Sequence, residues 1–456
     1  MKKRPNVILI TIDSLRADHC GFMGYEKKIT PNIDALAKES IVFTQAFANA
    51  PMTAQSLISL STSTYPLDYQ GPKKIEKPRI LVSEVFKKED YTTAVFTSNA
   101  YMSNFFGYNK GWDFFECFSK SPSEKERRNR IFFILEEISL LFFPLFLFLI
   151  KYIEYKKARK ELDFSETKFW KKPPDSLLTQ TLKDFISSTN RKSFFCWVHY
   201  GAPHIPYLPL KIYLNNFPLS FSEVVAISLP HHFSSHWNRK KLKKILTRRI
   251  KDIKELYDQA IQYEDLQIKN LINFLKKEKL YENTIIILTA DHGEEFLEHG
   301  QMTHPPQLYN ELLHVPLLMR IPEKKPQKIN KKVSLIDLFP SLLKILEISL
   351  PDSFKGKNFF TQEAEVILFH QTAFNEKKEG AFKYTEIESL KQCKIACQNE
   401  EWKYILSYEN SREELYNLLR DPQEKNNLIS KEKETAAKMR KRIEKFIQKN
   451  PPLSSL

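Results

Sequence analysis

The stretch that decides the fold runs from Thr284 to His304 and reads TIIILTADHGEEFLEHGQMTH. It begins with an unbroken aliphatic run, which is typical of a strand in a parallel sheet that is covered on both faces. The run stops at Asp291-His292-Gly293, where glycine permits a tight turn. Open α/β sheets bind their ligands at the carboxyl ends of their strands. Since carboxylate and imidazole are ligands for divalent metals, the stretch predicts a metal site at Asp291 and His292.

The beginning of the chain repeats this arrangement. Residues 7–12 form a largely apolar β-run that ends at Asp13, so a second acid lies at the carboxyl end of a strand. Residues 41–47, 92–96 and 194–198 are further short strand patterns, and helical patterns lie between them. This alternation predicts an α/β fold.

The composition limits the classes of function. The chain has 456 residues, 42% of them hydrophobic and 27% charged, which is typical of a globular protein. Its net charge of +15 is compatible with an anionic substrate or membrane surface, and no motif accompanies it that would predict a specific nucleic-acid site. Five scattered cysteines predict reduced thiols. Because the apolar run near the start is too short for a signal peptide, we expect a cytoplasmic protein without one.

A loop that carries hydroxyl side chains follows the predicted strand at residues 41–47. Residues 49–56, NAPMTAQS, predict a loop that opens a helix, with Thr53 or Ser56 at the helix N-terminus. Backbone N–H groups and the helix dipole favour an anion at such a position. A hydroxyl there can equally be an ordinary N-cap, and the local sequence leaves both interpretations open.

Five segments, in this order along the chain, resemble the sulfatase family of the alkaline phosphatase superfamily. They are ITIDSLRADHCGFMGYEKKITPNIDALAKESIVFTQAFANAP (10–51), TADHGEEFLEHG (289–300), LYNELLHVPLLMRIP (308–322), VSLIDLFPSLLKILEI (333–348) and ELYNLLRDPQEKNNL (414–428). Each segment alone is unspecific, but their combination and order are specific. The resemblance covers nearly the whole chain except roughly residues 120–180 and 210–250.

The resemblance implies an alkaline-phosphatase-like α/β fold, with a mostly parallel central sheet and helices on both faces. Residues 1–345 would form the catalytic domain, with an apolar and basic insertion at about 120–180. Shorter strand patterns and a terminal Lys/Glu-rich helix predict a smaller C-terminal α+β subdomain over 346–456, with a short antiparallel sheet.

On the family's pattern, Asp13, Asp291 and His292 match metal ligands, and we expect the Thr53 hydroxyl to coordinate the metal as well. The family often has a second acid directly after the first, where this chain has Ser14. The serine makes the metal site less anionic. In addition, the imidazole of His292 takes the place of the asparagine amide that other family members have. We therefore predict one divalent metal ion, with Mn²⁺ or Zn²⁺ favoured by ligand type and Ca²⁺ or Mg²⁺ as the alternatives.

The nucleophile departs from the family. The family's signature is Cys or Ser, any residue, Pro, Ser, Arg, and its first residue is oxidised to formylglycine. An ungapped alignment places Thr53 on that residue and Leu57 on the arginine. Threonine cannot become formylglycine because its Cβ carries a methyl group, so we predict no formylglycine. The resemblance then implies in-line attack by a threonine alkoxide, which favours phosphate monoesters or diesters and leaves sulfate esters open.

Further polar residues match positions around the family's substrate. His204 maps onto a substrate-contacting histidine that can bind an ester oxygen or protonate the leaving group. Asn99 follows a strand end as either a substrate contact or a turn residue. His299 is a candidate substrate contact, and His304 is a candidate for leaving-group protonation. We expect the acids near them to start a helix and face solvent; these are Glu294, Glu295 and Glu298.

Residues 131–153 are the most apolar stretch, and basic residues flank them. The uncharged part, residues 138–150, is shorter than the ~20 residues of a spanning helix. One interpretation is an interfacial anchor that makes the protein peripheral on an anionic bilayer, with a lipid-linked substrate. The other is a helix that covers the site as a lid.

The sequence therefore predicts a metal-dependent hydrolase of sulfate or phosphate esters whose substrate is lipid- or glycan-linked. One alternative is a transferase that moves a phospho-head group between lipid-linked acceptors. Another is a catalytically idle sulfatase-fold module that only binds. Metal content separates the last alternative from an enzyme, because an idle module need not hold a stoichiometric ion.

Overall fold

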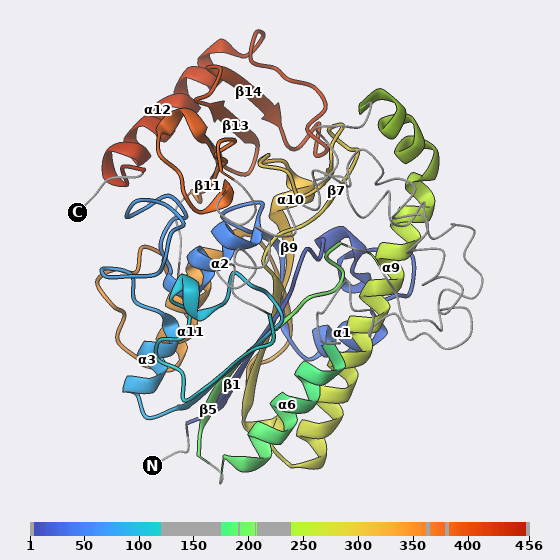
Figure 1. Cartoon of the computed structure of the whole chain (residues 1–456), viewed down its shortest axis with the longest axis vertical. Helices are drawn as coiled ribbons and strands as arrows, with labels where there is room; N and C mark the ends of the chain where they lie inside the picture. Colours follow the sequence, from blue (N-terminus) through green and yellow to red (C-terminus); the bar gives the residue numbers. More distant parts are fainter. Residues whose placement is uncertain are drawn as a thin grey trace, which may run out of the picture.

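The computed structural model describes residues 4–119, 175–189, 192–205, 207, 239–361, 365–378 and 383–452. In these ranges the chain forms a large sheet, a smaller antiparallel sheet and helices around both (Figure 1). The strands of the large sheet are β1 (Asn6–Ile12), β2 (Ile41–Phe47), β3 (Thr92–Thr97), β4 (Phe114–Cys117), β5 (Phe194–Tyr200), β6 (Thr284–Ala290), β9 (His314–Arg320) and β10 (Gln327–Ser334).

The eight strands lie in the order β10-β2-β9-β6-β1-β5-β3-β4. Strand β9 is antiparallel to both its neighbours, β2 and β6, and the other pairs are parallel. Every residue of β1, β5 and β6 is buried. Their apolar runs do not alternate because helices cover both faces of the sheet at its centre.

Figure 1 shows α1, α6 and α9 on one side of the sheet and α2, α3 and α11 on the other. The helices are α1 (Pro31–Lys38), α2 (Thr53–Thr62), α3 (Val82–Lys88), α6 (Asp175–Ser188), α9 (Arg239–Lys277), α10 (Asn310–Leu313), α11 (Leu338–Ile345) and α12 (Lys433–Lys449). Buried residues recur on α9 every three or four positions, as in Ile253, Tyr257 and Ile261. This period forms one apolar face that packs on the domain and leaves the basic residues toward solvent.

The register between β1 and β6 determines where the site lies. These strands pair in parallel, and Ile12 lies opposite Ala290. The next residue in each strand is an acid, Asp13 and Asp291. Because parallel strands end at the same edge of a sheet, the pairing brings the two carboxylates side by side.

The smaller sheet contains β11 (Leu368–Ala373), β12 (Cys393–Gln398), β13 (Trp402–Ser407) and β14 (Arg412–Asn417), all paired antiparallel. One face packs on α12 through residues such as Ile395 and Ile443. The other packs on the large domain through residues such as Ile405 and Phe47. The predicted fold class, a mostly parallel sheet with a small antiparallel C-terminal sheet, is confirmed.

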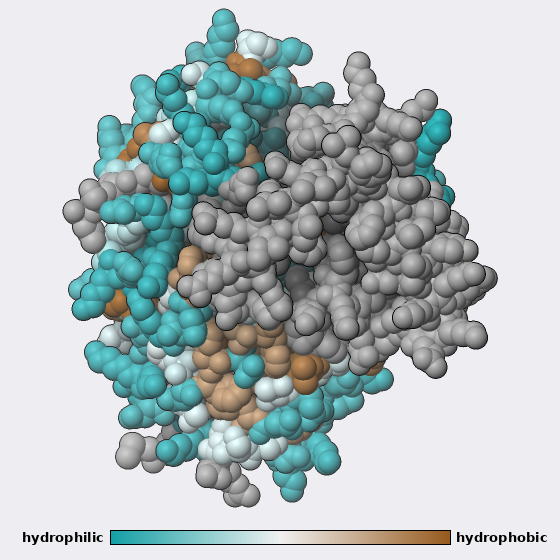
Figure 2. Space-filling view, viewed as in Figure 1, coloured by the Kyte–Doolittle hydropathy of each residue, from teal (hydrophilic) through white to brown (hydrophobic). Residues whose placement is uncertain are grey.

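Figure 2 shows that the described surface on one face is mostly hydrophilic, with a hydrophobic area where Figure 1 places the edge strand β4. All four residues of β4 are half-buried. In the part of the chain that the structure describes, no helix has the length and apolar character needed to cross a membrane. Residues 131–153 lie outside the described residues, so the anchor and the lid both stay predictions.

His370, on β11, sits fully buried at the junction of the two sheets. Its Nδ1 donates to the backbone oxygen of Ala48 at 2.7 Å. Burial, reinforced by the charge of Lys403, lowers the pKa of His370 from 6.5 to about 3. As the pH falls from 6.5 toward 3, the unfolded chain therefore binds a proton at this residue that the folded protein does not, and folding stability decreases.

This linkage predicts that the wild type loses about 2 kcal/mol more stability than His370→Asn between pH 7.5 and 5. Asparagine keeps a donor for the Ala48 oxygen but does not titrate. Urea unfolding at several pH values measures the difference. Parallel pH dependences of the two proteins would show that His370 does not remain neutral in the fold.

Candidate active site

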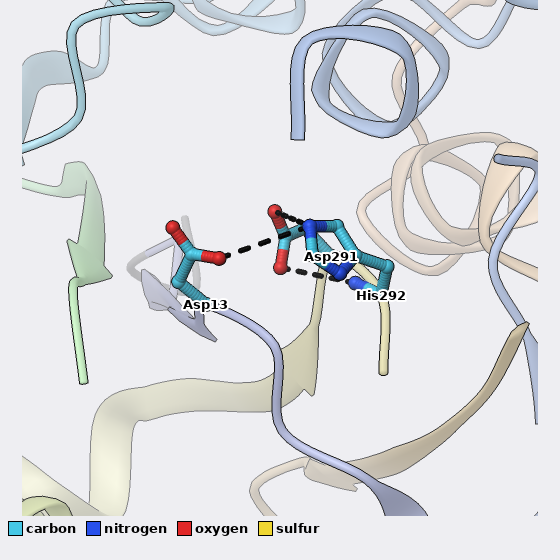
Figure 3. Close-up of side chains that lie close together, drawn as sticks. All are labelled: Asp13, Asp291 and His292. Carbon is cyan, nitrogen blue, oxygen red and sulfur yellow. Dashed lines mark hydrogen bonds and ion pairs between the residues drawn. The ribbon is translucent and has the colours of Figure 1, made fainter. Parts of the chain in front are cut away.

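The carboxyl ends of β1 and β6 bring three fully buried side chains together. One ligand atom from each of Asp13, Asp291 and His292 lies within 4.8 Å of the others. His292 Nε2 is 3.8 Å from Asp13 Oδ1 and 3.5 Å from Asp291 Oδ2. Figure 3 shows the carboxylates and the imidazole turned toward one another. We refer to these residues as the ligand triad.

Neighbouring groups orient the two carboxylates. Asp291 Oδ1 accepts from the backbone N–H of Ser14 at 3.1 Å, and Asp13 Oδ1 accepts from the Ser14 hydroxyl at 3.1 Å. Ser14 has φ of 64°, a left-handed conformation that is strained for serine and aims its N–H at Asp291. Asn99 Nδ2 donates to Asp13 Oδ2 at 3.0 Å. Ser14 and Asn99 thus hold the acids in place, and the structure gives Asn99 a contact with Asp13.

His292 presents a lone pair to the site. Its Nδ1 lies 2.8 Å from the backbone oxygen of Gly293, which can only accept, so Nδ1 carries the proton. In the neutral imidazole Nε2 is then the unprotonated nitrogen, and it lies 3.0 Å from Thr53 Oγ1. Gly293 is needed because a Cβ there would lie 2.1 Å from the backbone oxygen of Glu311. The turn therefore requires glycine for close packing.

The triad fits a cation. Burial raises the pKa of Asp13, but His204, His199 and His292 outweigh it and hold the pKa well below its usual range. Burial and the charge of Asp13 raise the pKa of Asp291. Among the described residues, Asp291 Oδ2 receives no hydrogen bond, and no lysine or arginine pairs with either acid. Two buried carboxylates and an imidazole lone pair are a donor set that a divalent metal ion satisfies.

Thr53 is the first residue of α2, and its side chain is directed at the triad. The N-cap is Met52, and no side chain caps this helix. The Ser56 hydroxyl donates to the backbone oxygen of Asp291 at 2.5 Å. Neither hydroxyl is therefore an N-cap, and the alternative that the local sequence left open is set aside.

Two further histidines line the site. The ring centroid of His304 lies 4.6 Å from that of His292 and 4.8 Å from that of His204. His304 Nδ1 is 3.3 Å from Glu294 Oε2, and the other oxygen of Glu294 accepts from the Tyr207 hydroxyl at 2.8 Å. Burial lowers the pKa of His304, but Glu294 outweighs it and raises the pKa above its usual value.

The prediction that the acids after His292 start a helix and face solvent is wrong. Glu295 begins the short strand β7 (Glu295–Phe296), which pairs with β8 (Met302–Thr303). Glu294 and Glu295 are fully buried. Glu298 pairs with Arg16 at 2.8 Å and with Lys254 at 3.1 Å. A hairpin forms instead of a helix, because strand pairing satisfies the backbone there and folds Glu294 under His304.

The structure does not bring His299 to the triad. Its Nδ1 lies 2.5 Å from Glu311 Oε1, and its Nε2 donates to the backbone oxygen of Glu424 at 3.0 Å. Its ring stacks on Tyr309 with centroids 3.6 Å apart. Because both ring nitrogens are engaged, the prediction that His299 contacts substrate is not supported. His299 instead joins the β7–β8 hairpin to Glu311 on α10 and to the backbone at Glu424.

Comparison with known proteins identifies the family. A family model described as Sulfatase matches residues 5–348. The chain belongs to the sulfatase family. A second model, described as N-sulphoglucosamine sulphohydrolase, C-terminal, matches residues 298–449.

Curated sulfatases are similar at low identity. The Ulvan-active sulfatase of Formosa agariphila is 24% identical over 78% of this chain and 64% of its own length. Arylsulfatase K of Canis lupus familiaris is 26% identical over 48% of this chain and 41% of its own length. The chain thus spans less than two thirds of these two relatives. The Arylsulfatase of Clostridium perfringens is 22% identical over 94% of this chain and 91% of its length.

Solved structures show the same fold. Phosphonate monoester hydrolase of Agrobacterium radiobacter superposes with a TM-score of 0.72 at 18% identity, covering 98% of this chain and 95% of that one. A protein in complex with its substrate D-glucosamine-2-N,6-O-disulfate superposes with a TM-score of 0.70 at 16% identity, over the full length of both. At these identities the likeness to the solved structures shows only the fold of this chain.

Sequence reasoning missed three residues of the candidate site. Glu294 and Tyr207 form the chain of hydrogen bonds behind His304. His199, on β5, lies with Nε2 3.6 Å from Asp13 Oδ2, and its Nδ1 is 2.8 Å from Thr11 Oγ1. A signal existed for His199, since it directly follows the apolar run 194–198 in the sequence, as Asp13 follows residues 7–12. No local signal existed for Glu294, because its burial depends on the β7–β8 hairpin.

Proposed function

We propose that this sulfatase-family protein hydrolyses sulfate or phosphate esters with Thr53 as the nucleophile. The observation that carries the proposal is the position of the Thr53 hydroxyl, 3.0 Å from His292 Nε2 beside two buried carboxylates. A hydroxyl at a helix N-terminus next to a cation-binding donor set is arranged for covalent catalysis. The ester-hydrolase class agrees with the names of the sulfatase and phosphonate monoester hydrolase relatives.

Asp13, Asp291 and His292 would hold a divalent metal ion, with the Thr53 hydroxyl next to them. When bound, such an ion supplies positive charge that favours the ionised hydroxyl and the charge developing on the ester. No formylglycine takes part, because a threonine side chain cannot be converted to one. Ligand type favours Mn²⁺ or Zn²⁺.

Thr53, His304 and His204 each have a separate role in the proposed reaction. Thr53 Oγ1 loses its proton to solvent and, as the alkoxide, bonds to sulfur or phosphorus, and the bond from that atom to the leaving oxygen breaks in line. His304 donates the proton from Nε2 to the leaving oxygen, because Glu294 holds its Nδ1 and favours the imidazolium. Water then bonds to the sulfur or phosphorus of the threonine ester and gives a proton to neutral His304, and the bond to Thr53 Oγ1 breaks, which restores the alkoxide and the imidazolium. His204 binds a non-bridging ester oxygen through Nε2, since its Nδ1 is held by the Ile205 oxygen at 2.6 Å.

The charge of the site favours a monoanionic ester. The two carboxylates of the triad match a divalent ion, and Glu294 matches protonated His304. Leu57 occupies the place of the family's arginine, so that cation is missing. A sulfate monoester, a phosphodiester or a phosphonate monoester therefore suits the site better than a dianionic phosphate monoester. Glycan sulfates are natural candidates, because relatives are named for ulvan and for glucosamine disulfate.

A panel of matched aryl esters tests the proposal. Sulfate, phosphate monoester, phosphodiester and phosphonate monoester substrates are assayed with protein reconstituted with Mn²⁺, Zn²⁺, Ca²⁺ or Mg²⁺. We expect turnover of one or more monoanionic esters that disappears with chelator. Turnover of phosphate monoesters alone would refute the charge argument. No turnover with any metal would favour a binding module.

Replacing His304 with asparagine should affect substrates according to their leaving group. The kcat/KM for alkyl esters is expected to fall by about 10²–10³-fold, since a poor leaving group needs a proton. For nitrophenyl esters, which leave as stable anions, the decrease should be less than about tenfold. An equal decrease for both classes would mean that His304 is not the proton donor. His299→Asn is the matched control, with little change expected for either class.

A further inference from the structure

A buried pair of carboxyl groups lies behind the loop that carries His204. Asp175 is the first residue of α6, and Glu264 lies on α9. Glu264 is fully buried, and Asp175 is 6% exposed. The two helices lie side by side on one face of the sheet (Figure 1). Neither carboxyl belongs to the triad or to the residues that line it.

Asp175 clamps the backbone directly after β5. Its Oδ1 accepts from the backbone N–H of Gly201 at 3.0 Å, and its Oδ2 accepts from that of Ala202 at 3.1 Å. These residues separate β5 from Pro203 and His204. Gly201 has no room for a side chain, since a Cβ would lie 2.9 Å from the Ser98 hydroxyl. The loop is thus pressed against the domain and held by one carboxylate.

Glu264 supports that carboxylate by carrying a proton. Neither oxygen of Glu264 receives an N–H or O–H from the described residues. Burial, the charge of Asp175 and the hydrogen bond between the two side chains raise the pKa of Glu264 well above its usual value. Asp175 accepts on both oxygens, so the shared proton resides on Glu264, which donates it to Asp175.

We propose that Asp175, with protonated Glu264 as its donor, is a positioning unit that holds the His204 loop against the active site. The proposal rests on the proposed function, in which His204 binds the ester. The His204 ring lies next to that of His304, with centroids 4.8 Å apart, so a shift of this loop would move His204 away from the ester. A displacement of about 1 Å in a substrate-binding group can cost about 10²-fold in rate.

Amide hydrogen exchange tests the clamp without any assay of activity. In Asp175→Asn, an NH₂ group replaces one of the two oxygens that accept from the backbone N–H groups of Gly201 and Ala202, so one of these hydrogen bonds is lost. The amides from His199 to His204 should therefore exchange at least about tenfold faster than in the wild type. Glu264→Gln is the matched control: its amide still donates to Asp175, and exchange should match the wild type. Glu264→Leu removes the donor and should speed exchange. Unchanged exchange in both Asp175→Asn and Glu264→Leu would overturn the clamp, even for an inactive protein.

A double-mutant cycle tests the link to His204. We expect Asp175→Asn to lower kcat/KM about tenfold in the wild type and to have little effect in a His204→Ala background, because only His204 needs the loop. Glu264→Gln should leave kcat/KM unchanged in both backgrounds. An equal effect of Asp175→Asn in both backgrounds would reject the positioning role. If Asp175→Asn fails to fold, Glu264→Leu takes its place in both experiments, with Glu264→Gln as the control.

Discussion

Replacing Thr53 with alanine is expected to lower kcat/KM for the preferred ester by about 10⁴-fold or more, the scale of losing a nucleophile. The hydroxyl lies 3.0 Å from His292 Nε2, and Ser56, on the next turn of α2, already donates to the Asp291 backbone. Ser56 therefore cannot replace Thr53 without breaking that hydrogen bond. Initial rates of the metal-loaded variant, with a matched folding control, measure the loss.

Two further variants separate nucleophilic from structural roles. Thr53→Val keeps the shape of threonine and should be as inactive as alanine. Thr53→Ser keeps the hydroxyl and should retain activity within about 10²-fold. During turnover of a slow substrate, mass spectrometry should find a sulfo or phospho group on Thr53. Activity of Thr53→Val close to the wild type would mean that another group attacks the ester.

Asp291→Asn is expected to change activity and metal-free stability in opposite directions. Activity should fall by at least about 10²-fold, because a neutral amide holds a cation poorly. In chelator at pH 8, however, the free energy of unfolding should rise by about 1–2 kcal/mol. In the variant, the amide oxygen still accepts from the backbone N–H groups of Ser14 and His292. The amide nitrogen replaces Oδ2, which receives no hydrogen bond in the wild type, and it can act as a donor there. Removing the charge also ends the repulsion with Asp13.

Asp337→Asn is the matched control for this experiment. Asp337 is another buried acid, and burial raises its pKa from 3.8 to about 7. Its substitution should also change stability, but it should leave activity and metal binding as in the wild type. Added metal should raise the Tm of the wild type and of Asp337→Asn, and not that of Asp291→Asn. A lower metal-free stability of Asp291→Asn would show that the triad is not strained by like charges.

Local patterns were sufficient for the central strands and for the acids at their ends. The apolar run at 285–288 has few alternatives to a buried strand, and an acid after such a run can only lie at its carboxyl end. Once β1 and β6 are neighbours, the register of Ile12 with Ala290 makes Asp13 and Asp291 meet. The fold class could therefore be predicted from these patterns, and the family from its resemblance to five segments in order along the chain.

Contacts between distant segments could not be predicted in this way. Nothing near His299 indicates that its ring nitrogen will bond to the oxygen of Glu424, 125 positions away. Glu294 resembles any acid at a helix start until the β7–β8 hairpin buries it under His304. The clamp on Gly201 comes from Asp175 on α6, 26 positions earlier, and its proton donor comes from α9.

The sequence by itself therefore determined which strands form, which residues end them and to which family the chain belongs. The strands and their ends depend on hydrophobic periodicity and on residues within a few positions of each other, and the family depends on the order of five motif segments along the chain. Only the tertiary structure decided the tautomer of His292, the burial of Glu294, the separate place of His299 and the clamp behind His204. Each of these depends on which polar atom packs against which across elements far apart in the chain, and a buried polar group takes whichever partner packing supplies.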